Sequence, residues 1–319
     1  DNSNFINVAG GVLKSENIGV GASVAITDLT KNTQAYLGDN ISVSTNTASG
    51  TNYNISPLTE LTAKNDGNIV GVTLAGAVTK GKKIEVTDEH ESEGGNGKYG
   101  IGISSDVVYS NVNSNASAYT NNINYSGEKG LSLNATDDQN LYNVAGAIGL
   151  ALGTQSLSVG IAGAVTIANI SNDTLTAVKN SKIVDKGDIK LDSTSKANIV
   201  SASASGSGAT SEGVGVSVAG SVTTNNIKDT NKSYIDNTII EAKGLDAKAT
   251  DSAKITSVAG AVSVTKGTVG IGASVDLNNV ENTTTAFTNK SQITLTNDSI
   301  LLAQDKTRIV GVAGTVGVS

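Results

Sequence analysis

The chain has 319 residues, including 36 glycines and one proline, and it lacks cysteine, methionine and tryptophan. Its formal charge of −7, with lysines scattered along the chain, argues against a nucleic-acid ligand, because phosphate binding requires clustered basic residues. The absence of cysteine excludes disulfides, and a single histidine leaves little for zinc. Hydrophobic residues still make up 38% of the chain, mainly Val, Ile, Leu and Ala, so we expect it to fold.

Larger and smaller side chains alternate in the first clear pattern along the chain, from Val20 to Ile26. A period of two predicts strands, and helix signals are nearly absent. Between the later strands, short polar segments such as Lys186 to Asp188 and Thr296 to Asp298 predict turns. The pattern that begins at residues 18–36 returns at 101–119, 159–178, 216–234 and 269–287.

These segments define five copies of a repeat, each marked by one polar residue at its centre. The marks are Asp28, Asn111, Asn169, Asn226 and Asn279. A second landmark, usually Ala-Gly after an aliphatic residue, precedes each copy at Val8, Leu74, Val144, Ala202 and Val258. It occurs again at Val312, where a sixth copy begins. We therefore expect a fragment of a longer array.

A repeat of about 53–58 residues with several short strands predicts an all-β, right-handed parallel β-helix, or β-solenoid. Each copy is expected to make two to three coils, and residues 1–319 a single solenoid fragment. The alternative is an array of antiparallel sandwiches, which usually has aromatic core anchors. With 3% aromatic residues, the chain favours the solenoid.

Two series of positions recur with the repeat. The aromatic slot comprises Tyr36, Tyr119, Tyr234 and Phe287, with Val178 in the remaining copy. It could be a sugar-binding platform, but acceptance of valine favours an interior or corner packing stack. The central Asp and Asn residues could hold a ligand, although a structural ladder of side chains at a turn is the better interpretation.

Two insertions interrupt the repeat, at about residues 39–57 and 79–99. Insertions into a solenoid are where specific binding is usually found. In the second insertion, Asp88, Glu89, Glu91 and Glu93 are a weak candidate for a calcium site, although a solvated acidic loop fits this pattern better. No cofactor is predicted. The candidate binding residues of the two loops are His90, Asn96, Lys98, Tyr53 and Asn54.

Catalysis has little support in the sequence. Carboxylates and aromatic residues do not cluster outside the acidic loop, and no catalytic triad can be assembled around His90. A glycan-processing β-helix enzyme is therefore the remote alternative, and we expect a protein that is not an enzyme.

The phrases Val-Ala-Gly-Ala-Val-Ser-Val at 258–264 and Val-Gly-Ile-Gly-Ala-Ser-Val at 269–275 resemble repeats of large exported Gram-negative proteins. These are the fusobacterial leukotoxins and the filamentous-haemagglutinin-like adhesins. The resemblance implies a secreted or surface-displayed β-helical virulence factor that binds a receptor or glycan on host cells, leukocytes for a leukotoxin. It also implies an outer-membrane secretion partner. The alternative that it leaves open is a passive shaft segment of an autotransporter adhesin.

Overall fold

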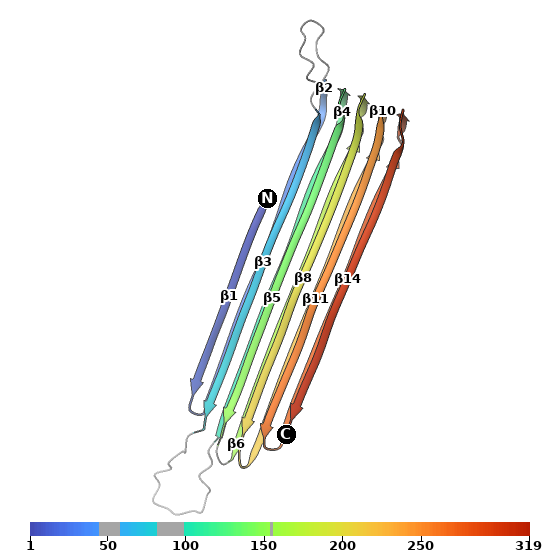
Figure 1. The fold of residues 1–319 in the computed structure, drawn as a ribbon. Coiled ribbons are helices and arrows are strands. Elements are labelled where there is room, and N and C mark those ends of the chain that lie inside the picture. Colours follow the sequence, from blue (N-terminus) through green and yellow to red (C-terminus); the bar gives the residue numbers. More distant parts are fainter. Residues whose placement is uncertain (45–57, 82–98, 154–155) are drawn as a thin grey trace, which may run out of the picture.

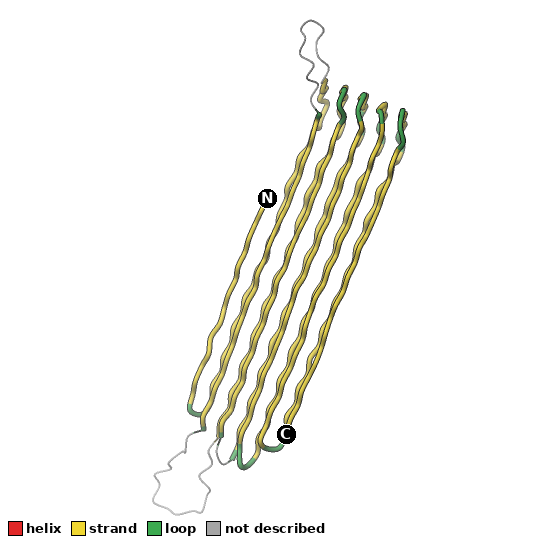
Figure 2. Tube along the Cα trace, in the orientation of Figure 1, coloured by secondary structure: helices red, strands yellow, loops and turns green. Residues whose placement is uncertain are grey.

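A computed structural model describes residues 1–44, 58–81, 99–153 and 156–319 (Figure 1). Within these ranges every regular element is a strand (Figure 2). The described residues therefore contain no helix that could cross a membrane. The chain runs back and forth along one direction, so that long strands lie side by side in two facing sheets (Figure 1). The predicted all-β class is therefore confirmed.

The first sheet has six long strands. In spatial order they are β1 (Asn2–Ser15), β3 (Thr59–Lys80), β5 (Leu131–Leu152), β8 (Asp188–Thr210), β11 (Gly244–Lys266) and β14 (Ser299–Val318). The second sheet contains five long strands: β2 (Ile18–Ser44), β4 (Tyr99–Gly127), β6 (Leu157–Lys179), β9 (Val214–Asp236) and β12 (Val269–Asn289). Three short strands complete it: β7 (Lys182–Asp185), β10 (Ile239–Ala242) and β13 (Gln292–Leu295).

All recorded pairings between the described strands are parallel, which supports a β-helix or solenoid and excludes the antiparallel sandwich array. Asn111 lies opposite Asn169, and Asn169 lies opposite Asn226. One step across the sheet therefore advances the chain by a whole repeat. The prediction of two to three coils per copy was wrong. Each copy makes one coil, because two very long strands, not several short ones, take up most of each repeat.

The strand register corrects two positions in the sequence alignment. Val8 lies opposite Val72, so the landmark at Leu74 is displaced by two residues. The aromatic slot of the third copy holds Ala177, which lies opposite both Tyr119 and Tyr234, while Val178 is buried beside it. The predicted turns at 186–188 and 296–298 do separate β7 from β8 and β13 from β14.

Small side chains fill the interior over one half of the coils. In β6, Ala162 and Ala164 are buried, whereas the neighbouring Ile161 is 36% exposed. In β5, Ala147 is buried and Ile148 is 46% exposed. The larger residue of each alternating pair therefore points outward in this half, and Ala, Gly and Ser line the inside.

Glycines in this half allow the two sheets to approach each other closely. A Cβ atom on Gly160 of β6 would lie 2.3 Å from the carbonyl oxygen of Gly208 in β8. On Gly149 of β5, it would lie 2.0 Å from the carbonyl oxygen of Ile161. No side chain fits at such distances, so the glycines set the spacing between the sheets.

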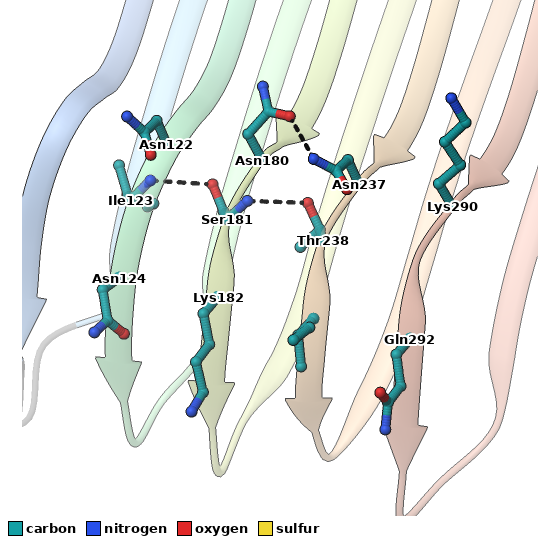
Figure 3. Close-up of a pocket in the computed structure, with 11 residues that line it drawn as sticks. Asn122, Ile123, Asn124, Asn180, Ser181, Lys182, Asn237, Thr238, Lys290 and Gln292 are labelled. Carbon is teal, nitrogen blue, oxygen red and sulfur yellow. Dashed lines mark hydrogen bonds between the residues drawn. The ribbon is translucent and has the colours of Figure 1, made fainter.

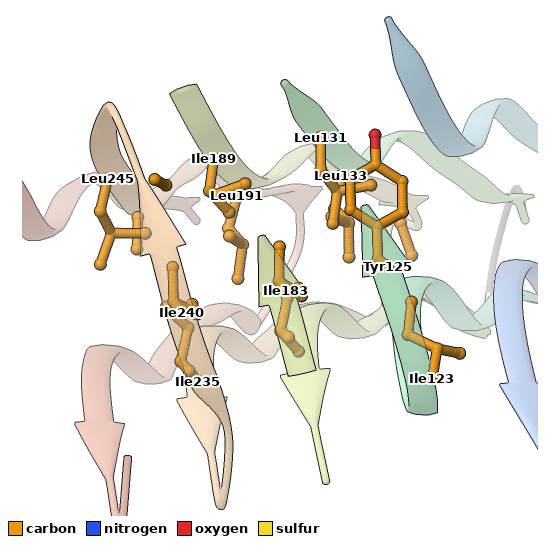
Figure 4. Packing of buried hydrophobic residues seen from close by; sticks show 14 of the residues in the cluster. Ile123, Tyr125, Leu131, Leu133, Ile183, Ile189, Leu191, Ile235, Ile240 and Leu245 are labelled. Atoms are coloured by element: carbon orange, nitrogen blue, oxygen red, sulfur yellow. The ribbon is translucent and has the colours of Figure 1, made fainter. Parts of the chain in front are cut away.

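The other half of each coil is wider and has a conventional apolar core. Leucine and isoleucine side chains from both sheets and from the short strands pack together around Tyr125 (Figure 4). A second row of buried aliphatic residues, including Leu141, Ile170 and Ile227, lies towards the middle of the long strands. Burial of such residues supplies most of the hydrophobic stabilisation.

A matched pair of glycine substitutions tests this cross-section. We expect Gly160→Ala to lower the free energy of unfolding by about 1–3 kcal/mol, because its methyl group meets backbone of the opposite sheet. Gly163→Ala points into open space and should change it by less than about 0.5 kcal/mol. Urea denaturation measures both, and equal effects would contradict the inward orientation of Gly160.

Candidate functional site

The candidate residues of the two insertions lie outside the described residues. This holds for Asp88, Glu89, His90, Glu91, Glu93, Asn96, Lys98, Tyr53 and Asn54. The binding-loop and calcium hypotheses therefore stay predictions. In the described ranges, no group of three or more His, Cys, Asp or Glu side chains could hold a metal ion.

A row of residues with a left-handed backbone conformation forms one corner of the solenoid. Asn122, Asn180, Asn237 and Lys290 have φ angles of 54°, 48°, 48° and 48°. Asparagine adopts this conformation more readily than most residues, because its short side chain can bond to nearby backbone. The corner turns the chain from β6, β9 and β12 into the short strands β7, β10 and β13, and Asn122 occupies the same place within β4.

Two hydrogen-bond ladders hold the corner in register (Figure 3). The Nδ2 atom of Asn237 donates to Oδ1 of Asn180 at 2.9 Å. Beneath this row, the backbone N–H groups of Ile123 and Ser181 donate to the hydroxyls of Ser181 and Thr238 in the next coil, at 3.2 and 3.4 Å. The sequence carries this signal as Asn followed by Ser or Thr at 180–181 and 237–238, which our sequence analysis missed.

An open polar hollow of about 680 Å³ lies along the corner and extends across several coils. One wall carries Asn180, Asn237 and Lys290, and the other carries Lys182 and Gln292. Neither lysine forms an ion pair within the described part of the chain. The amides of Asn122, Asn180 and Asn237 thus repeat along the hollow at the strand spacing of about 4.8 Å. Each wall carries one lysine.

The aromatic slot forms an outward stack rather than an interior one. Tyr36 and Tyr119 stack with their centroids 5.2 Å apart, and Tyr234 and Phe287 with theirs 4.9 Å apart. The ammonium of Lys179 fills the gap over Ala177, 5.7 Å from the Tyr119 ring and 5.2 Å from the Tyr234 ring. Ring faces are thus covered by neighbours, so this geometry favours packing over a sugar platform.

The central Asp and Asn residues also form a ladder, but in the middle of the strands and not at a turn. Asn111 Nδ2 donates to Oδ1 of Asp28 at 2.9 Å, and Asn279 Nδ2 donates to Oδ1 of Asn226 at 2.8 Å. The residues lie on the outer surface of the second sheet. Their bonds between successive coils support a structural role.

A buried polar layer crosses the interior between the two apolar clusters. Asn172 of the second sheet donates through Nδ2 to the hydroxyl of Ser195 in the first sheet at 3.3 Å. Its backbone N–H donates to Oδ1 of Asp229, also at 3.3 Å. Within the described residues, the Oδ2 atoms of Asp137, Asp229 and Asp251 have no hydrogen-bond partner.

Burial raises the pKa values of these carboxyl groups, so they stay protonated to higher pH than an exposed aspartate does. Desolvation raises the pKa of Asp229 to about 8, and the nearby Asp251 carboxyl adds to the shift. Desolvation and the Asp305 carboxyl raise the pKa of Asp251 to about 7. The pKa of Asp137 rises to about 6, limited by hydrogen bonds and by Lys31. A neutral carboxyl avoids the large cost of an unpaired buried charge.

The corner conformation can be tested at Asn237. Asn237→Ala places an alanine in the left-handed region and removes the bond to Asn180, so we expect a loss of about 1–2 kcal/mol in the free energy of unfolding. Asn237→Gly should cost less, because glycine adopts this conformation without strain. Urea denaturation provides the measurement, and an alanine variant as stable as the glycine variant would refute the assignment.

The buried carboxyls predict that the protein loses stability as pH rises. Between about pH 4 and the folded pKa values, the unfolded chain releases protons that the folded chain retains. The free energy of unfolding should therefore decline from about pH 4 to about pH 8. Asp229→Asn, which mimics the neutral acid, should flatten the decline, whereas Asp173→Asn, an exposed site on the neighbouring strand β6, should not. Urea denaturation across this range is the test, and stability that increases with pH would contradict it.

Comparisons with known proteins identify no relative. No family model matches the chain, and neither a curated protein nor a solved structure does.

Proposed function

We propose that the chain is a right-handed β-solenoid segment of five repeats that binds host cells. In this proposal it belongs to a secreted or surface-displayed bacterial virulence factor of the fusobacterial leukotoxin and filamentous-haemagglutinin-like class. It is not an enzyme, it takes no cofactor, and its target is a receptor or glycan on leukocytes. An outer-membrane secretion partner exports the whole protein. The corner hollow is the observation on which binding by this chain rests.

The hollow has features that fit an extended polyanionic glycan. Amide side chains line the hollow in successive coils, and Lys182 and Lys290 add one ammonium group each in two of the coils, so a polymer lying along the solenoid axis meets hydrogen-bond donors at several points. Lys182 and Lys290 are exposed and can attract carboxylate or sulfate groups as point charges. Another polar hollow that crosses several coils is lined by Asp188, Asp246 and Asp298, which would repel a polyanion, whereas no carboxylate of the described residues lines the corner hollow.

The passive shaft is the alternative that a binding measurement separates from this proposal. We expect the fluorescently labelled chain to bind leukocytes and a sulfated oligosaccharide to compete. The variant with Lys182→Gln and Lys290→Gln should bind at least ~10-fold more weakly, because it loses both ammonium groups that face the hollow. Flow cytometry measures cell binding.

A matched control carries Lys254→Gln and Lys306→Gln. These lysines are exposed on the first sheet, away from the corner, and the control loses the same two charges. If the control loses as much binding as the corner variant, general electrostatics accounts for the effect. If the intact chain binds no leukocytes, the shaft interpretation stands. A variant lacking residues 80–98 tests the second insertion, because only that variant should lose binding if the loop makes the contact.

A further inference from the structure

The outer face of the second sheet carries an apolar strip at the glycine-rich half of the solenoid. Its most regular feature is a ridge with valine in each of five successive strands: Val24, Val107, Val165, Val222 and Val275. The two terminal members, Val24 and Val275, are 56% and 46% exposed. The side chains of this ridge point away from the interior, where they add nothing to the core.

A groove of small residues runs beside the valine ridge, two positions earlier in each strand. It consists of Ala22, Ser105, Gly163, Gly220 and Ala273. A Cβ atom added to Gly163 or Gly220 would meet no atom within 4 Å, so the floor of the groove is open. A second aliphatic ridge borders the other side and comprises Val20, Ile103, Ile161, Val218 and Ile271.

Ridge, groove and ridge together form a surface that is complementary to itself. A two-fold axis that places the valine ridge of one copy in the groove of another also places the second copy's valine ridge in the first copy's groove. The coil spacing of about 4.8 Å is the same in both copies, so all five valines can insert together. No charged residue occurs in the three columns, so this contact would bury no unpaired charge.

The size of the strip matches that of a stable dimer interface. With the two flanking columns, which begin at Ile18 and Ile26, the strip extends about 26 Å along the strand, and five strands cover about 24 Å across, which gives roughly 600 Å² on each copy. Two copies would bury roughly 1,200 Å², at the lower end of the range of specific interfaces. A flat apolar area of this size is at the upper end of what a monomeric soluble protein exposes.

The outer face of the first sheet is less suitable. It has a valine column at Val8, Val72, Val144, Val258 and Val312, with Ala202 in the fourth strand, but the exposed Leu74 interrupts the small-residue column beside it. Gly76 and Gly206 interrupt the ridge on the other side of that column. An interrupted ridge leaves gaps opposite any groove, which forfeits packing contacts. The two faces therefore differ in shape, although both expose aliphatic residues.

We propose that this face of the second sheet is a homodimer interface, in which the valine ridge of each copy inserts into the small-residue groove of the other. The two solenoids would then pack sheet on sheet, at a separation of about 10 Å. The contact joins the sides of the solenoids and leaves their end coils free.

Sedimentation equilibrium of the 319-residue chain tests the proposal, over concentrations of about 1–100 µM. We expect a reversible dimer. Gly163→Val together with Gly220→Val fills the groove at two positions where an added Cβ atom meets no other atom within 4 Å, and it should weaken association at least ~10-fold by blocking the ridge. Val165→Lys, which places a charge in the ridge, should weaken it similarly.

The matched control is Gly206→Val with Gly260→Val. These glycines lie on the outer face of the first sheet, and a Cβ atom at either also meets no atom within 4 Å. The control should dimerise as the unaltered chain does. Circular dichroism should show the same strand content in all variants.

Three outcomes would overturn the proposal. The unaltered chain could stay monomeric over the whole range, including the case in which it instead floats with neutral phosphatidylcholine vesicles. The groove-filled variant could associate as strongly as the unaltered chain, which would point to end-to-end stacking of the terminal coils. The control could lose association to the same extent, which would place the contact on the other sheet or make it nonspecific.

Discussion

Parallel pairing of each strand with its equivalent one repeat away is the constraint on which this structure depends. It satisfies the backbone of both sheets and stacks each side chain on the residue at the same position in the next coil. Favourable stacking is then repeated from coil to coil. One example is the hydrogen bond that Asn225 Nδ2 donates to Asn278 Oδ1 at 2.7 Å. Unfavourable stacking would be repeated too, so a column gains from neighbouring charges of opposite sign, as at Asp138 and Lys196, or from acids that stay neutral. The raised pKa values of Asp229 and Asp251 mean that these carboxyl groups favour the uncharged form.

The size of the inward side chains sets the cross-section of each coil. Glycine and alanine bring the sheets together in one half, where the backbone at Gly160 approaches that at Gly208. Leucine and isoleucine hold them apart in the other half, around Tyr125 (Figure 4). The wide half has the larger apolar burial and therefore more hydrophobic stabilisation. The thin half depends on dispersion contacts and backbone pairing, and its larger aliphatic residues remain outside.

Much of the architecture could be predicted from the sequence, because a repeat and a period of two are direct consequences of stacked strands. Which face of each strand points inward could not be predicted, because alternation identifies two faces without saying which one is buried. The usual preference for burying large residues would have placed Ile161 inside, and only the close approach of the sheets at Gly160 excludes it. The aromatic slot was displaced by one residue in the third copy because Ala177 replaces the ring there and the next residue, Val178, is the larger side chain. The corner asparagines were missed because a left-handed φ leaves only a weak trace in sequence. The two insertions lie largely outside the described residues, so the binding hypotheses about them remain predictions.

The exposed features divide between the two ends of the long strands. The aliphatic strip occupies the beginning of β6, and the corner hollow follows its end at Asn180. Strands of this length extend about 75 Å at 3.3 Å per residue, so pairing through the strip leaves the corner uncovered. A two-fold pair would then present two identical hollows, one on each copy. Binding of one long polyanion by both would make the second contact intramolecular, which increases avidity without requiring a stronger single site. If the proposed cell binding and dimer both hold, a modest affinity at each hollow would suffice for attachment, and the affinity for a short oligosaccharide would be lower than that for the polymer.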